Sequence, residues 1–122
     1  MNTAVDRVNA RRAEIERMFA YLARLRPLAV VTSCGWLLPS AFYHRVLGAW
    51  WSDILASVSA GASMQDADAA VTAAVVRHGL REEDFDAAAI GQSPEGLARE
   101  IHRLAGIASA GHALGDMARA VA

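Results

Sequence analysis

The feature that most constrains the fold is a long run of helical periodicity over residues 3–26, which contains neither proline nor glycine. Apolar side chains recur there at three- and four-residue intervals, so they line one face of a helix. They are Val5, Val8, Ile15, Met18, Phe19, Leu22 and Leu25. Pro27 then ends the helix, because proline lacks an amide hydrogen and disfavours helical angles in the preceding residue. A chain that opens in this way must bury one face of a long helix against other elements.

The remainder of the chain carries further helix signals, with caps and breakers at the boundaries. Serine precedes two of the apolar patterns, and glycine ends three of them. Helices are predicted over residues 39–61, 63–79 and 81–91, and from 93 towards the C-terminus as one helix or two. No stretch has a credible partner for strand pairing. The sequence therefore predicts an all-α fold, a compact bundle of four to six helices that forms a single domain over residues 1–122.

Composition narrows the environment and the partners. The net charge of −1 provides no general attraction for nucleic acid or an anionic membrane. All basic residues other than histidine are arginine, as is typical of a GC-rich bacterial genome. Cys34 is the single cysteine, so no internal disulfide can form, and a reducing cytoplasm is expected. The charged N-terminal turns do not resemble a secretory signal, and the uncharged stretch 28–43 is shorter than the ~20 residues of a membrane span, so no membrane association is expected.

Aromatic residues suggest where a protein partner binds. Trp50 and Trp51 are adjacent, and on a helix they point about 100° apart, which makes them hard to bury in one seam. One of them is therefore expected to face a partner or a pocket, although core filling is an alternative for both. The predicted partner interface consists of Trp36, Phe42, Trp50, Trp51 and Ile54. The partners are expected to be a second copy of the chain, as a homodimer, and an unidentified protein.

The stretch "SPEGLAREIHRL" (93–104) raises the possibility of DNA binding. Ala87, Gly91 and Leu97 have the spacing at which a helix-turn-helix places its small residue, its turn glycine and its anchoring apolar residue. Over residues 81–104 the chain thus resembles helix-turn-helix regulators, and the resemblance implies that Arg99, His102 and Arg103 read DNA. Acidic residues crowd the same surface, however, and would repel phosphate.

Other chemistry has little support in the residue pattern. The chain has no glycine-rich phosphate loop, no pair of histidines one turn apart and no carboxylate–histidine motif at di-iron spacing. The sequence therefore predicts no catalytic residue, no metal and no cofactor. The motif "GHALG" (111–115) favours a close helix crossing. A pocket for a small apolar ligand, lined by Trp36, Phe42, Trp50 and Met64, is a further alternative.

These observations lead to three hypotheses. The first is a non-enzymatic, cytoplasmic helical protein that acts through protein–protein contacts as a homodimer, in the manner of a small regulator, adaptor, antiactivator or immunity protein. The second is a DNA-binding transcriptional regulator with a degenerate helix-turn-helix over 81–104. The third is a bundle that binds a small apolar ligand.

Overall fold

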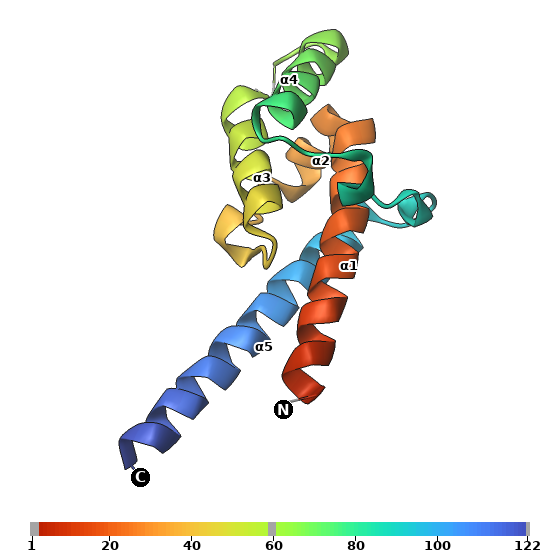
Figure 1. The fold of residues 1–122 in the computed structure, drawn as a ribbon. Helices are drawn as coiled ribbons and strands as arrows, with labels where there is room; N and C mark the ends of the chain where they lie inside the picture. The colour runs from red at the N-terminus through yellow and green to blue at the C-terminus, as the bar shows by residue number, and fades with distance from the viewer. Residues whose placement is uncertain (1–2, 59–60, 122) are drawn as a thin grey trace.

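Helices and short turns account for all of the regular structure in the part of the chain that the computed structural model describes. That part is residues 3–58 and 61–121, with side chains described for 4–58 and 61–110. No strand is present in it, so the prediction of an all-α bundle is confirmed (Figure 1). The α-helices are α1 (Thr3–Leu25), α2 (Pro27–Cys34), α3 (Arg45–Ser57), α4 (Met64–Arg77) and α5 (Pro94–Val121). The 3₁₀ turns are η1 (Pro39–Ala41), η2 (Glu82–Asp84) and η3 (Ala87–Ala89).

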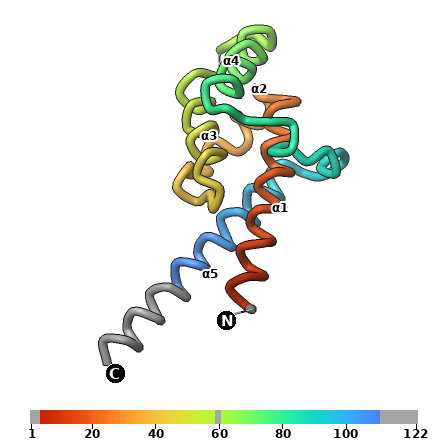
Figure 2. Tube along the Cα trace, in the orientation of Figure 1, coloured from red at the N-terminus to blue at the C-terminus, as the bar shows by residue number. Residues whose placement is uncertain are grey.

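Helices α1 and α5 pack against each other and run in opposite directions (Figure 2). The middle of α1 supplies Ile15, Phe19 and Leu22 to the core, as its periodicity predicts. The start of α5 buries residues at the same three- and four-residue intervals, namely Leu97, Ala98, Ile101 and Leu104. The two ends of the α1 stripe stay exposed, because Val5 and Leu25 lie beyond the packed centre.

Helix α3 is enclosed by its own chain, which explains how two adjacent tryptophans are both buried. The Trp51 ring points towards α1 and meets Phe19 edge to face, with 5.0 Å between ring centroids. The Trp50 ring points towards the segment after α4 and meets Phe85 edge to face at 5.5 Å. Trp50 and Trp51 are 1% and 0% exposed. The expectation that one of them faces outwards is therefore wrong, because α3 has packing partners in both directions.

Local caps decide where several helices begin and end. Ser63 accepts a hydrogen bond from the Asp66 amide, and α4 then runs to a turn in which Gly79 has φ of +64°. The helix predicted from Pro39 begins later than expected, since Pro39 opens the separate turn η1. The cap of α3 is His44, whose Nδ1 accepts from the Leu47 amide at 3.2 Å.

Asp53 ties α3 to the C-terminal end of α4. Its carboxylate accepts hydrogen bonds from Arg77 and His78, and also from Ser57 one turn further along α3. Partial burial would raise the pKa of Asp53, but these hydrogen bonds outweigh it and hold the pKa below its usual range. The tie therefore holds the C-terminal end of α4 against α3.

The segment over residues 81–91 is not the helix that the sequence predicts. The Asp84 carboxylate accepts from the Arg81 amide at 2.8 Å and the Asp86 carboxylate accepts from the Ala88 amide at 2.9 Å, so each aspartate starts or closes a separate turn. Between the two turns the backbone is extended, and the Asp86 amide donates a hydrogen bond to the Arg17 carbonyl of α1. The Phe85 side chain is buried in the core. Aspartate capping and the burial of Phe85 override the helical pattern.

The last helix, α5, is continuous, so the C-terminal region forms one helix and not two. The side chains of the "GHALG" motif lie outside the described residues. No helix in the described part of the chain has the length and apolar character needed to cross a membrane.

Candidate partner-binding surface

The five predicted interface residues fall into two groups. Trp36 is 49% exposed, whereas Phe42, Trp50, Trp51 and Ile54 are at most 7% exposed. Those four already fill the core and are not available to a partner, which corrects the predicted interface. Their burial depends on α1 and on residues 81–91, far away in the sequence.

Further large apolar side chains close to Trp36 in the sequence are exposed, on the segment that joins α2 to α3 and on the first turn of α3. Leu38, Tyr43 and Val46 are 65%, 47% and 41% exposed. Single exposed apolar residues are ordinary, but large ones gathered on one short segment are typical of a binding surface. We call the four side chains of Trp36, Leu38, Tyr43 and Val46 the 36–46 surface.

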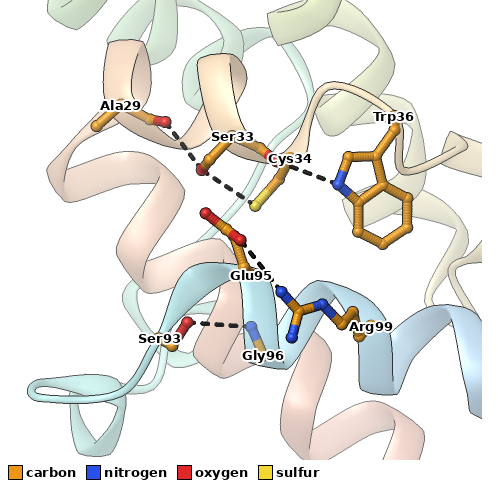
Figure 3. Close-up of polar contacts among 8 residues, drawn as sticks. All are labelled: Ala29, Ser33, Cys34, Trp36, Ser93, Glu95, Gly96 and Arg99. Atoms are coloured by element: carbon orange, nitrogen blue, oxygen red, sulfur yellow. Dashed lines mark hydrogen bonds and ion pairs between the residues drawn. The ribbon is translucent and has the colours of Figure 1, made fainter.

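Trp36 lies over the start of α5. Its ring meets His102 of α5 edge to face, with 6.0 Å between ring centroids. Its Nε1 donates to the Ser33 carbonyl at 3.1 Å, so the polar edge is satisfied and the ring remains open (Figure 3). The ion pair between Glu95 and Arg99 of α5 lies nearby in the same view.

Tyr43 lies at the other end of the segment, over α1. The Arg12 guanidinium is 5.3 Å from the centre of its ring, a cation–π contact, and Arg12 Nη2 donates to the Ala41 carbonyl at 3.1 Å. The segment thus bridges α5, through Trp36, and α1, through Tyr43.

A buried carboxylate on α1 anchors this segment. Glu16 is 0% exposed, the one charged side chain that is fully buried among the described residues. Its two oxygens accept from the amides of Tyr43 at 2.8 Å and His44 at 2.9 Å. Burial raises the pKa of Glu16, and the two amides only partly oppose this effect. Burying the carboxylate costs free energy, and its two hydrogen bonds fix the backbone at Tyr43 and His44.

Two further contacts hold the segment from the side of α3. Trp51 Nε1 donates to the Leu37 carbonyl at 2.9 Å, a fully buried hydrogen bond. Gly48 lets the chain pass close to α3, since a Cβ atom there would lie 2.8 Å from the Pro39 carbonyl oxygen. The 36–46 surface is therefore held in place before any partner arrives, which lowers the entropic cost of binding.

Glu16 was not identified from the sequence. The available signal was its place one turn from Phe19 and Ala20 and two turns from Ala23, all of which are buried. A charged residue within such a stripe must have a compensating partner. That partner is a pair of backbone amides 27 and 28 residues away, which no local pattern reveals.

The residues predicted to read DNA have other partners. Arg99 pairs with Glu95 at 3.2 Å, Arg103 Nε donates to Glu100 at 2.9 Å, and His102 packs against Trp36. The Ser93 hydroxyl caps α5 as expected, accepting from the Gly96 amide. The first helix of the motif is replaced by η2 and η3, so residues 81–104 do not form a helix-turn-helix. The arrangement from which DNA binding was predicted is therefore not formed by residues 81–104.

The predicted ligand pocket does not form either. Phe42 and Trp50 are in the core, Trp36 is on the outer surface, and Met64 borders a different groove beside α2. Within the described residues, no cluster of three or more histidine, cysteine, aspartate or glutamate side chains could hold a metal ion. Cys34 is buried, and burial raises the pKa of its thiol, with Ser33 as its hydrogen-bonding neighbour.

Comparisons with protein-family models, with curated proteins and with solved structures found no match to this chain. Function is therefore inferred from the geometry of the chain itself.

Proposed function

We propose that this chain is a non-enzymatic protein-interaction module that works as a homodimer through the 36–46 surface. The observation that carries the proposal is the set of exposed apolar side chains on a segment held rigidly by Glu16, Trp51 and Gly48. An irregular segment with this much exposed apolar area gains free energy when it is covered, at roughly 25 cal/mol per Å².

The charges around the surface suit a second copy of the chain. Near Trp36, α5 carries the pair of Glu95 and Arg99, and the same helix carries a second pair, Glu100 and Arg103, so both signs of charge are present on α5. A two-fold interface brings the same patch of each subunit together, and a rim with both signs can then pair across the axis. The net charge of −1 gives little repulsion between copies.

Sedimentation equilibrium tests the proposal with variants that leave the core intact. Trp36→Ser and Leu38→Ser remove exposed apolar area from the 36–46 surface, whereas Val76→Ser removes a comparably exposed residue from α4 and serves as the matched control. We expect the wild type and Val76→Ser to dimerise at micromolar concentration. Each surface variant should weaken the dimer about tenfold or more, as for a hot-spot residue.

Two outcomes would overturn the proposal. One is a wild-type chain that stays monomeric over the whole concentration range. The other is a dimer whose dissociation constant is the same in Trp36→Ser and Leu38→Ser as in the control Val76→Ser. The interface would then lie elsewhere.

A further inference from the structure

A groove runs along the junction between α1 and α2. None of the residues that line it belongs to the 36–46 surface. Helix α1 ends at Leu25 and α2 begins at Pro27, so the chain changes direction within one residue. The start of α4 forms the other wall, through Met64 and Asp68. The groove is open to solvent on one side and has a volume of about 560 Å³, within the range of ~300–1,000 Å³ for small-molecule sites.

The walls of the groove are largely apolar. They are formed by Leu25, Pro27, Leu28, Ala29 and Met64. Leu25 is 53% exposed and Met64 is 74% exposed, so two large apolar side chains face water here. Covering them with an apolar molecule is favourable, and methionine adapts readily to the shape of what it contacts.

The polar groups at the groove define the rest of the ligand. Within the described part of the chain, the Arg26 guanidinium and the Asp68 carboxylate have no hydrogen-bond or ion-pair partner, and they do not pair with each other. The Thr32 hydroxyl already donates to the Leu28 carbonyl at 2.7 Å, so it offers no free donor. The groove therefore presents one unpaired cation and one unpaired anion beside an apolar wall.

The two charges differ in position. Arg26 stands between Leu25 and Pro27, so apolar wall residues flank it on both sides. Asp68 also borders a second hollow, which contains Arg24 and Thr72, whereas Arg26 borders only this groove of the two. A carboxylate meets attraction at Arg26 and repulsion at Asp68, so the two charges fix the direction in which an anionic amphiphile lies.

We propose that this groove binds a medium-chain aliphatic carboxylate. Its head group pairs with the Arg26 guanidinium, and its hydrocarbon chain covers Leu28 and Met64. This binding site is additional to the proposed dimer surface and does not depend on it.

Isothermal titration calorimetry of the full chain with sodium decanoate tests the proposal, with decanol and decyltrimethylammonium as neutral and cationic probes. We expect one decanoate per chain and weaker binding of decyltrimethylammonium. Arg26→Gln should weaken decanoate binding about fivefold and leave decanol unaffected, since an exposed ion pair contributes modestly. Arg45→Gln, which changes an exposed arginine outside the groove, should change neither.

A second variant blocks the apolar part of the site. Ala29 is an exposed wall residue, so Ala29→Phe fills the groove without disturbing the core, and Ala73→Phe on the exposed face of α4 is its matched control. Decanoate binding should be lost in the first and kept in the second, with both folded by circular dichroism. The proposal is overturned by a folded wild type that binds none of the probes, by equal affinity for the cation, or by an Ala29→Phe variant that binds decanoate normally. Loss of the dimer in Ala29→Phe would instead assign the groove to a second copy, which also overturns it.

Discussion

Replacing Glu16 by alanine removes the carboxylate that holds two backbone amides of the segment before α3. The amides of Tyr43 and His44 lose their only acceptor, at 2.8 and 2.9 Å, and alanine offers no substitute. A donor left unsatisfied by the loss of its partner costs about 1–3 kcal/mol when buried. These two hydrogen bonds are partly buried, so we take about 1–2 kcal/mol for each, or about 2–4 kcal/mol in total.

Urea unfolding at pH 7, followed by far-ultraviolet circular dichroism, measures this loss. Glu14→Ala is the matched control, because Glu14 lies half a turn away and makes only an exposed ion pair with Arg11. The control should lose less than about 0.5 kcal/mol. Glu16→Gln should fall between the two, since its carbonyl can accept from one amide and no charge is buried. If Glu16→Ala costs no more than Glu14→Ala, the anchoring role assigned to Glu16 is refuted.

Further predictions concern glycine and pH. Gly48→Ala should destabilise the fold by about 1–3 kcal/mol in urea unfolding, because the new Cβ atom meets the Pro39 carbonyl oxygen. Gly106 has open space around it, so Gly106→Ala should stabilise α5 by about 0.5–1 kcal/mol. Equal effects of the two substitutions on stability would contradict the close approach of the chain at Gly48. The pKa of Glu16 is higher in the folded chain than its usual value near 4.5, so the resulting contribution to stability is fully present below about pH 4.5. That contribution is lost as pH rises through the pKa of Glu16 in the folded chain. Over this interval the wild type should lose stability relative to Glu16→Gln, as measured by urea unfolding. The lowered pKa of Asp53 has the opposite effect, because its contribution to stability is present above about pH 3.8 and is lost as pH falls through the pKa of Asp53 in the folded chain. Asp53→Asn should therefore make the free energy of unfolding depend less on pH in the acid range.

Helix boundaries could be predicted where the signal is local. Pro27 ends α1, Ser63 caps α4 and Ser93 caps α5, because each acts on amides or carbonyls within one turn. The prediction for 81–91 was wrong because Asp84 and Asp86 also act locally, as caps of two short turns.

The candidate site could be predicted only in part. Trp36 was identified by its aromatic character, but the exposure of Leu38 and Tyr43 follows from the path of the chain between α2 and α3. The burial of Trp50 depends on Phe85, 35 residues further on, and no pattern around Trp50 indicates it. Tertiary contacts of this kind decide which apolar residues remain available for a partner.

Fluorescence quenching by acrylamide, measured over a range of protein concentrations, tests whether the 36–46 surface is covered in the dimer. Trp36 is exposed whereas Trp50 and Trp51 are buried, so the quenchable emission of the dilute chain comes from Trp36. We expect this emission to become protected from acrylamide as protein concentration rises, in step with dimer formation, and we expect Trp36→Phe to remove it. Trp36 emission that is quenched equally at every concentration, in a chain that nevertheless dimerises, would contradict the assignment of the interface to the 36–46 surface.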